Sequence, residues 1–587
     1  MAWILLIVLT GGFTLRLPGV KVSARHLGGP LVALALAGAL RGTLGLRERG
    51  GLGWLRAWLG RRGRVVGLLL LVVLLATAVR VPGLFWGYRL FGEMTVPYLG
   101  PDEGHYAGEI ASRILNRQPA VRDGSPTGLG AQVALGWYLL KLLDREAVAR
   151  SPAFWFFAGR VIALLHGVAT VVLIYFFARE LFGSPATALL AAYFLALADL
   201  HVTMSHVAKQ DGAATFWLYA ALYAALRGTR RPRPLTLAVA AVAAGAAAAM
   251  KFVTVTLIPL AWAVARSRRR VASAVGVVLV AAGALYLFSG FQVTGRFLMD
   301  SRQLVAFLLK SPGYPRILHV PLYLGYLLVG VSLPVFGLAA YGLWLARPRG
   351  IRAVAAWLAD ERLPLGLALA VAFWQMTRLR IPSPHYAVIL VPAVALLAAR
   401  GFQELRQRLA GRLDPGPALL AALSVYLLVH VASVQAYFVR DTREVAGEWL
   451  RQHVPPTEIL SVSHYVLVPP EYRTTLFLDQ RYLVLHGDGY RRYVVRHNVH
   501  YKFTGRFPER REIYNADAGL GHYPRIAQLF RGELPYRLVK RADLEFLTPE
   551  LRLARFLEIL PPFLADTLIF ERGEPRGGAR AEGRRAR

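Results

Sequence analysis

Apolar stretches long enough to cross a lipid bilayer recur along most of this sequence, and a water-soluble globular chain would rarely contain so many. Of its 587 residues 55% are hydrophobic, yet its formal net charge is +34. The basic residues gather in arginine clusters between the apolar runs, as at 61–64, 230–233 and 266–270. This pattern is a membrane-topology signal rather than a nucleic-acid footprint. We expect an all-α polytopic protein of the cell (inner or plasma) membrane that binds the lipid bilayer and no nucleic acid.

The apolar runs predict roughly 11 to 13 transmembrane helices. Two short runs at 1–14 and 27–40 come first, and a basic segment separates them from a stronger run at 65–84. The first run has no basic lead-in and no small-residue cleavage site, so we interpret it as a retained span rather than a signal peptide. The further runs are 156–177, 185–200, 204–226, 235–250, 252–265, 271–291, 321–345, 353–376, 386–399 and 418–438.

These runs divide the chain into four parts. Residues 1–63 hold extra N-terminal membrane segments and a basic cytoplasmic loop, and residues 64–440 form the membrane domain. Within the membrane domain, residues 88–150 form an outer loop with interfacial helices, because Trp and Tyr accompany their helical patterns. Residues 441–572 predict a small extracytoplasmic α/β domain, with a helix at 441–453 and strands at 459–467 and 474–485. Residues 573–587 predict a disordered basic tail.

The arginine-rich turns at 227–233, 266–270, 347–352 and 400–412 fall on one side of the membrane under this topology. The polar loops 88–150 and 377–385, and everything after residue 440, fall on the extracytoplasmic side. The chain contains no cysteine, which excludes disulfides, thiol nucleophiles and thiolate metal sites.

The first polar cluster is the acidic pair Asp102 and Glu103, followed by His105 and Tyr106, at the start of a helical pattern. Asp102 could serve as a helix N-cap, a role for which Asp is favoured. It could also act as a general base, or as half of a metal site with His105. No complete set of metal ligands is visible, so we assign no metal residues, and a divalent cation stays open as a cofactor.

The second cluster spans residues 201–211 and includes His206, Lys209 and Asp211, where one span ends and the next begins. Such polar groups at a membrane-embedded helix start are difficult to explain as packing. On a continuous helix Lys209 and Asp211 point to nearly opposite sides, so both can line one pocket only where the first turn is irregular. Alternatively, Asp211 is a buried structural acid and Lys209 meets an anion at the positive helix end.

A third cluster, in the outer loop 377–385 and just after it, contains Arg378, Arg380, His385 and Tyr386. Arginine forks suit phosphate, and an aromatic ring beside a polar group suits a sugar face. The arginines could instead anchor a helix at the headgroups. Lys251 lies between two short apolar runs and is either a pocket residue or a lysine that reaches back to the interface.

The three clusters resemble the GT-C class of membrane glycosyltransferases, which use a polyprenyl-phosphate-linked sugar donor, and above all the protein O-mannosyltransferases and the aminoarabinose transferases of lipid A. The acidic pair resembles the catalytic-loop motif of that class. The segments 158–183, 205–211, 245–259 and 384–392 carry the rest of the resemblance, which covers about residues 65–438. The extra N-terminal segments depart from the family pattern.

The resemblance implies an inverting glycosyltransferase that works on the extracytoplasmic face with Asp102 as base, and that passes the sugar to a lipid, glycan or protein acceptor. The leaving phosphate needs cations, for which the candidates are Lys209, Lys251, Arg378 and Arg380. Glu103, His105 and Tyr386 could orient the sugar or the acceptor. Two other hypotheses stay open: a transporter or flippase of lipid-linked glycans, and a non-catalytic scaffold, which predicts that the clusters do not converge.

Overall fold

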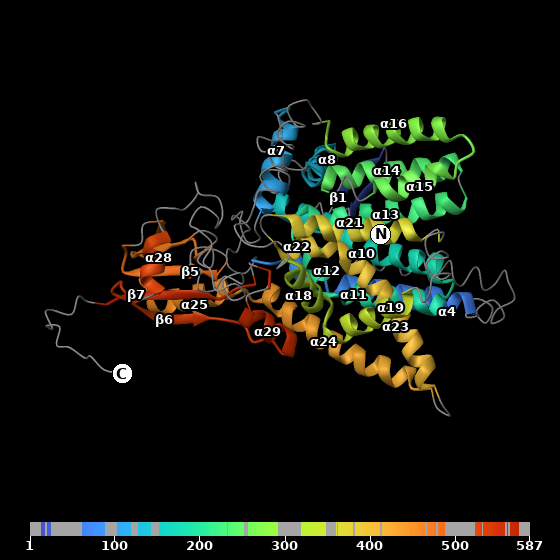
Figure 1. Ribbon diagram of the computed structural model, residues 1–587. Helices are drawn as coiled ribbons and strands as arrows, with labels where there is room; N and C mark the ends of the chain where they lie inside the picture. Colours follow the sequence, from blue (N-terminus) through green and yellow to red (C-terminus); the bar gives the residue numbers. More distant parts are fainter. Residues whose placement is uncertain are drawn as a thin grey trace.

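The computed structural model of this chain describes nineteen stretches of the sequence. These are residues 13–17, 20–24, 61–87, 102–118, 127–142, 152–231, 233–251, 256–291, 319–347, 360, 362–379, 382–410, 414–463, 466–476, 479–487, 523–530, 532–557, 560–561 and 564–573. They form a large helical bundle with a smaller mixed α/β region beside it (Figure 1).

The bundle contains the long apolar helices that the sequence predicts. Among the described residues five helical stretches are long and apolar enough to cross a membrane, namely Gly63–Leu84, Trp155–Phe182, Arg270–Phe288, Pro384–Leu409 and Gly416–Val439. A sixth candidate is the pair α18 (His319–Val331) and α19 (Leu333–Ala346), bent by 118°. The residue at the bend, Ser332, has a φ of 78°. The prediction of a multi-pass, mainly helical membrane protein is confirmed.

The other expected runs between residues 156 and 438 are mainly helical where they are described, but the predicted spans 185–200 and 204–226 are interrupted by non-helical residues at 197–198 and 205–209, and several of the helices are short. They are α11 (Pro185–Ala196), α12 (Asp199–Met204), α13 (Gln210–Arg230), α14 (Pro234–Met250), α15 (Leu257–Ala265) and α21 (Leu363–Arg378). The remaining long helices are α4 (Arg61–Ala78), α10 (Pro152–Phe182), α16 (Arg270–Phe288), α23 (Val391–Leu409) and α24 (Gly416–Val439), with α5 (Val81–Leu84) after α4, and α22 (Pro384–Ala387) and η3 (Val388–Leu390) before α23.

The N-terminal prediction differs from the structure at one point. Residues 13–17, where we expected the first membrane span to end, form strand β1 (Phe13–Leu17), which pairs antiparallel with β2 (Val20–Ala24). The run 27–40 lies outside the described residues.

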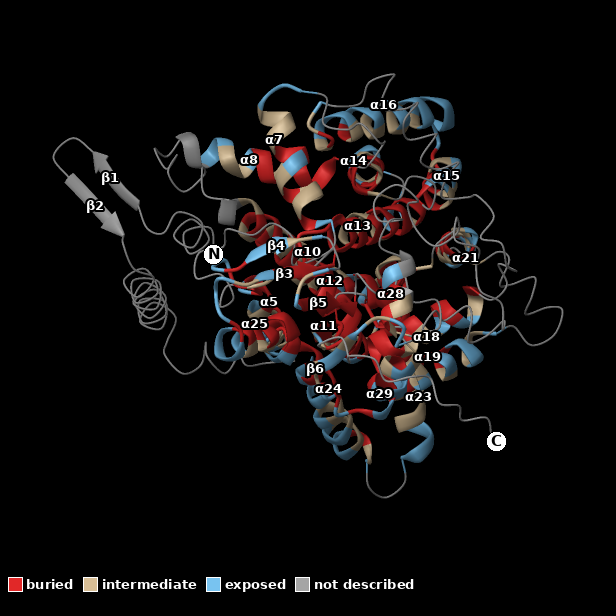
Figure 2. Ribbon diagram, turned by 90° about the vertical axis from the view of Figure 1, so that its left-hand side faces the viewer, coloured by how far each residue is buried: buried red, intermediate tan, exposed pale blue. Residues whose placement is uncertain are grey.

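Small residues allow the helices of the bundle to approach closely. Gly342 on α19 and Gly401 on α23 face one another's backbones, and a methyl group at either position would clash with a carbonyl oxygen of the other helix. Gly245 brings α14 against α16 in the same way. Close backbone approach at small residues is the usual basis of helix association in lipid. The most buried segments are α11, α12 and α13, whereas α16 is largely exposed (Figure 2).

The first outer loop packs its helical part onto the bundle. It contains the π-helix η1 (Gly104–Glu109), α7 (Ile110–Leu115) and α8 (Gly128–Leu142). A small buried cluster joins these helices to α10 and to the turn before α13: Ala107, Ala111, Val133, Ala134, Ala158 and Ala208. On α8 the side chains of Leu135, Tyr138 and Leu139 are exposed. Their contact with the membrane interface stays a prediction.

The C-terminal region contains the predicted helix and a sheet, but the predicted strand 459–467 ends at Val462, and the predicted strand 474–485 is two separate strands. Helix α25 (Thr442–His453) leads into a five-stranded sheet in the order β4-β3-β5-β7-β6. β3 (Ile459–Val462) lies parallel to β4 (Arg473–Thr475) and β5 (Tyr482–His486), and β7 (Thr567–Arg572) is antiparallel to β5 and β6 (Tyr536–Ala542). Two more helices, α28 (Tyr523–Phe530) and α29 (Pro549–Leu557), complete its described part.

Helix α29 attaches this region to the bundle. Glu550 accepts hydrogen bonds from the Tyr426 hydroxyl at 2.6 Å and from the backbone N–H of Leu333 at 3.3 Å. The ring of His430 contacts Thr548 Oγ1 at 3.0 Å. The C-terminal region therefore meets the bundle through α24 and the start of α19.

Candidate functional site

The acidic pair lies at the entrance to η1, and its two carboxylates point in different directions. Asp102 has a φ of 67°, in the left-handed region that Asp and Asn tolerate better than most side chains. The N-cap of η1 is Glu103, and among the described residues no side chain caps that helix. The expected role of Asp102 as a helix cap is therefore not seen. The backbone reversal at Asp102 separates its carboxylate from that of its neighbour.

Glu103 is fully buried and belongs to the framework of the site. Its two oxygens accept from Arg160 Nε at 2.9 Å and Arg160 Nη2 at 2.8 Å, and Oε1 also accepts from the backbone N–H of Ala208 at 2.8 Å. The side chains of Arg160 and Glu103 are 2% and 0% exposed. In this structure the oxygens of Glu103 are occupied inside the protein by Arg160 and Ala208, and the expected contact of Glu103 with the sugar or the acceptor stays a prediction.

Asp102, in contrast, lies at the surface of the site. Its Oδ2 accepts from Lys209 Nζ at 2.9 Å, and its side chain is 48% exposed, against 8% for Lys209. A carboxylate that is half exposed beside a cation can be reached by a substrate group. The contact also joins the first outer loop to the start of α13.

The irregular first turn that would allow Lys209 and Asp211 to share a pocket is present. Lys209 has extended backbone angles, φ −129° and ψ 148°, and α13 begins only at Gln210. The ammonium of Lys209 lies within electrostatic reach of both Asp102 and Asp211. The two cluster residues therefore face one region although they are two positions apart.

Asp211 continues the line of charges to Lys251. Its Oδ1 accepts from Lys251 Nζ at 2.5 Å, and its side chain is fully buried while that of Lys251 is 16% exposed. The same ammonium lies 4.4 Å from the centre of the Tyr386 ring, a cation–π distance. Lys251 follows α14 directly at its C-cap, where the helix ends. The structure thus makes Lys251 a residue of this site rather than one that reaches to the interface.

Tyr106 and His385 complete the wall of the site. Burial, and secondly the charge of Asp102, raise the pKa of the Tyr106 hydroxyl above its ordinary value, so that it stays protonated. The hydroxyl also interacts with Gln210. The ring of His385 bonds through Nδ1 to Ser383 Oγ at 2.6 Å, and both Lys209 and Lys251 act on it electrostatically.

Of the remaining predicted site residues, His105 packs its ring against that of Tyr106 with centroids 5.1 Å apart, two lie elsewhere, and one is not described. His105 bonds to Glu109 at 3.0 Å, and the ring of His206 is buried against Phe438 with centroids 4.3 Å apart. Arg378 is exposed and lies over the ring of Trp374. Arg380 lies outside the described residues. The structure therefore gathers Asp102, Tyr106, Lys209, Asp211, Lys251, His385 and Tyr386.

Two further residues belong to the site that the sequence did not single out for a role. Arg160 lies within an apolar run, and a charge inside such a run signals a buried partner. Its partner Glu103 is 57 residues away, which no local pattern reveals. No sequence pattern marked Gln210 as a site residue. Its side chain lies at the site because Gln210 is the first residue of α13.

The two site carboxylates are matched by two ammonium groups rather than by other metal ligands. Asp102 pairs with Lys209, and Asp211 pairs with Lys251. Across the described residues, no group of three His, Asp or Glu side chains is arranged to hold a metal ion. The expected divalent cation is thus untested, and the donors present suit an anionic ligand.

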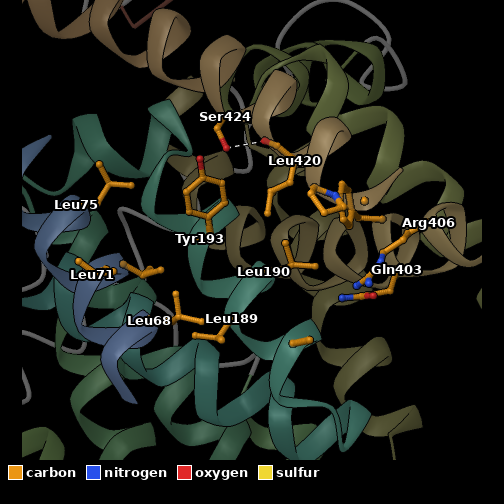
Figure 3. A pocket seen from close by; sticks show the side chains of 15 residues that line it. Leu68, Leu71, Leu75, Leu189, Leu190, Tyr193, Gln403, Arg406, Leu420 and Ser424 are labelled. Atoms are coloured by element: carbon orange, nitrogen blue, oxygen red, sulfur yellow. Dashed lines mark hydrogen bonds between the residues drawn. The ribbon is translucent and has the colours of Figure 1, made fainter. Parts of the chain in front are cut away.

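A cavity of about 490 Å³ lies between α4, α11, α23 and α24 and shares no lining residue with the site above. Leucines of α4 and α11 form much of its wall, with Tyr193 and Ser424 on one side and Gln403 and Arg406 on another (Figure 3). Arg406 is paired with Asp414. This cavity is apolar and offers no cluster of catalytic groups.

Comparison with known proteins gives one family match. Residues 153–293 match the family model described as dolichyl-phosphate-mannose-protein mannosyltransferase. These residues run from α10 to α16 and supply Arg160, Lys209, Asp211 and Lys251. No curated protein matches the sequence at a significant level. For this part of the chain, the resemblance to the protein O-mannosyltransferases of the GT-C class is confirmed.

Three solved structures are similar to this one. ArnT from Cupriavidus metallidurans bound to undecaprenyl phosphate is 17% identical over 67% of this chain and 73% of its own, with a TM-score of 0.43. The apo oligosaccharyltransferase of Archaeoglobus fulgidus is 15% identical over 71% of this chain and 61% of its own, with a TM-score of 0.44. The same oligosaccharyltransferase tethered to an acceptor peptide is 12% identical over 88% of this chain and 89% of its own, with a TM-score of 0.46.

Proposed function

We propose that this chain is an inverting glycosyltransferase that moves a sugar from a polyprenyl-phosphate donor to a hydroxyl group of a lipid, glycan or protein acceptor, on the extracytoplasmic face of the membrane. The observation that carries the proposal is the half-exposed carboxylate of Asp102 beside the ammonium of Lys209, with Lys251 behind it. The family match over residues 153–293 supports the class of donor.

The charges of the site suit the two ends of such a reaction. As the bond between the sugar carbon and the phosphate oxygen breaks, the electron pair returns to the phosphate, whose negative charge needs cations nearby. Lys209 and Lys251 supply them. Both lysines are largely enclosed, where a charge acts more strongly than in water.

Asp102 supplies the other requirement, a proton acceptor. The acceptor oxygen forms its bond to the sugar carbon from the face opposite the leaving phosphate, and its proton passes to the Asp102 carboxylate. A single displacement of this kind inverts the configuration at the sugar carbon. Tyr386 and His385 border the same space and offer a ring face and a polar group to the sugar.

The convergence of the clusters argues against a scaffold without catalytic function. A scaffold predicted that they do not meet, whereas Asp102, Lys209, Asp211, Lys251 and Tyr386 form one connected set of contacts. A flippase places its substrate site near the bilayer midplane, and no observation here favours that reading over transfer.

The decisive experiment replaces Asp102 by Asn and follows covalent transfer of a radiolabelled sugar from polyprenyl phosphate in membranes that contain the protein. We expect at least a hundredfold loss of transfer, as is usual when a general base is removed. Glu109→Gln is the matched control, because it is the same acid-to-amide change in the same loop, at a half-exposed carboxylate that pairs with His105 and Arg113 on its own helical stretch.

Two results would contradict the proposal. One is full transfer by the Asp102→Asn protein. The other is movement of the lipid-linked sugar across vesicles by purified protein without covalent transfer, which would identify a flippase.

A further inference from the structure

We infer that Trp86 is a positioning residue that couples the C-terminal α/β region to the acidic turn carrying Asp102. The inference rests on the proposed function and adds a residue to it that neither the acidic motif nor the family match contains. Trp86 follows α5 and is fully buried, one of the largest buried side chains among the described residues. It lies between two buried arginine–carboxylate pairs and contacts both.

The first of these pairs belongs to the membrane domain. Arg160 donates from Nη1 to the backbone carbonyl of Trp86 at 2.8 Å, and its guanidinium lies 5.5 Å from the centre of the indole. The other nitrogens of the same guanidinium hold both oxygens of Glu103. Since Glu103 directly follows Asp102, Arg160 ties the backbone at Trp86 to the acidic turn.

The second pair belongs to the start of the C-terminal region. The indole Nε1 of Trp86 donates to Asp441 Oδ2 at 2.7 Å. Asp441 is the N-cap of α25 and accepts from the backbone N–H of Arg443, while the Arg443 side chain bonds to both of its oxygens. The Arg443 guanidinium lies 5.4 Å from the indole centre. Arg443 and Asp441 are 1% and 0% exposed in their side chains.

Trp86 is therefore the shared member of two interactions that cannot relax into water. A buried charge pair with all its hydrogen bonds made resists displacement, because breaking it leaves an uncompensated charge. Its indole is fixed by the C-terminal region and its carbonyl by Arg160. A shift of α25 is transmitted through this residue to Glu103 and to the position of the Asp102 carboxylate, where misplacement by an ångström can lower a rate about a hundredfold.

The test compares Trp86→Phe with the neighbouring change Phe85→Leu. Trp86→Phe keeps an aromatic ring but removes the N–H that reaches Asp441, whereas the Phe85 side chain is 52% exposed and lies beside the ring of Phe157. We expect Trp86→Phe to lower kcat about tenfold while leaving KM for the donor unchanged. Asp441→Asn weakens the same hydrogen bond and also removes the charge partner of Arg443, so it should lower kcat at least as much as Trp86→Phe, and the double variant should be no worse than Asp441→Asn alone.

A second readout needs no substrate. The chain contains no cysteine, so one introduced at Asn116, at the exposed end of α7, accepts a single nitroxide spin label. We expect Trp86→Phe to increase the mobility of this label, and to leave unchanged the mobility of a label at Glu404 near the end of α23. Unchanged label mobility together with unchanged kcat would overturn the inference, and so would an equal increase with Phe85→Leu.

The two readouts separate this inference from the proposed function. If the unmodified protein transfers no sugar, the glycosyltransferase proposal fails, yet the label at residue 116 still shows whether Trp86 holds the acidic turn. If transfer occurs but Trp86→Phe changes neither the label mobility nor kcat, the glycosyltransferase proposal stands and the proposed coupling through Trp86 fails.

Discussion

Asp102 and Glu103 are neighbours of the same chemical type, but their environments differ in almost every respect. Asp102 has one cation near its Oδ2 and is 48% exposed, while Glu103 is fully buried and receives three hydrogen bonds from Arg160 and Ala208. The backbone reversal at Asp102 allows two consecutive carboxylates to face surface and interior. We call these the rim pair, Asp102–Lys209, and the interior pair, Glu103–Arg160.

The difference shows that two consecutive acidic residues can have separate roles, one structural and one toward a substrate. Buried charges are tolerated in a fold only while both partners are present. Removing one partner leaves an uncompensated buried charge and destabilises the protein. Charges at a surface contribute little to stability, so a substrate can interact with them at little cost to the fold. The interior pair therefore fixes the turn, and the rim pair presents the carboxylate and ammonium at which we propose chemistry. Each of the following predictions tests this division.

The largest effect is expected from Arg160→Ala, which leaves Glu103 buried without its cation. We expect the free energy of unfolding to fall by about 3 to 5 kcal/mol, the usual result of breaking a buried pair. Thermal unfolding of the detergent-purified protein would measure it. Arg113→Ala removes a partly exposed arginine paired with the half-exposed Glu109 and serves as the control. Equal stability of the two variants would show that the buried Glu103–Arg160 pair does not stabilise the fold more than a partly exposed pair does.

Lys209→Met should lower activity strongly and stability only slightly, the opposite of what we expect from Arg160→Ala. The variant loses a charged group that donates a hydrogen bond to the phosphate, which should cost about 1.5 to 3 kcal/mol of transition-state stabilisation. We therefore expect kcat/KM for the polyprenyl-phosphate sugar to fall roughly ten- to a hundredfold. Unfolding should shift far less than with Arg160→Ala, because Asp102 is half exposed and can be solvated. Steady-state kinetics together with the same unfolding assay would test this. A variant that transfers sugar normally but unfolds readily would show that Lys209 is structural.

A double-mutant cycle between Asp102 and Lys209 should report a small coupling. We expect about 1 kcal/mol of stability, at the upper end of the range for exposed ion pairs because Asp102 is half exposed while Lys209 is largely enclosed, measured from unfolding of Asp102→Asn, Lys209→Met and the double variant. The coupling should weaken as salt is added. A value of several kcal/mol would mean that the rim pair supports the fold as the interior pair does.

The smallest effect is expected from Glu109→Gln. Glu109 accepts from His105 and Arg113, each four residues away on the same helical stretch, and its side chain is 49% exposed. Pairs at this spacing contribute about 0.2 to 0.5 kcal/mol each. Unfolding and sugar transfer should both stay close to those of the unmodified protein, and a marked loss of transfer would extend the site to this residue.

Much of the fold could be predicted because hydropathy determines which segments enter the membrane. The long helices lie where the apolar runs are, and the helix and strands after residue 440 follow from their period. The run 185–200 was predicted as one span, but α11 ends at Ala196 and a separate helix, α12, begins at Asp199. Apolar composition alone does not distinguish a full crossing from two shorter helices.

The site was predictable only as a set of unusual residues. Asp102, Lys209, Asp211 and Lys251 stand out because charges are rare within or beside membrane helices. Whether Lys209 and Asp211 face one pocket depends on whether α13 begins at residue 209 or 210, and sequence patterns do not locate helix ends that finely. The buried partners of the site, Arg160 and Trp86, depend on tertiary contacts across 57 and 355 residues.

The left-handed backbone of Asp102 restricts how this position can change. With a φ of 67° the position accommodates Gly, Asn and Asp readily and disfavours branched or bulky side chains. An alanine there would combine the loss of the carboxylate with backbone strain, so a failed alanine variant would not separate the two. Asparagine alone removes the charge while keeping both the shape and the local preference. At this position the amide is the informative substitution, and a library of random replacements would mostly report on folding.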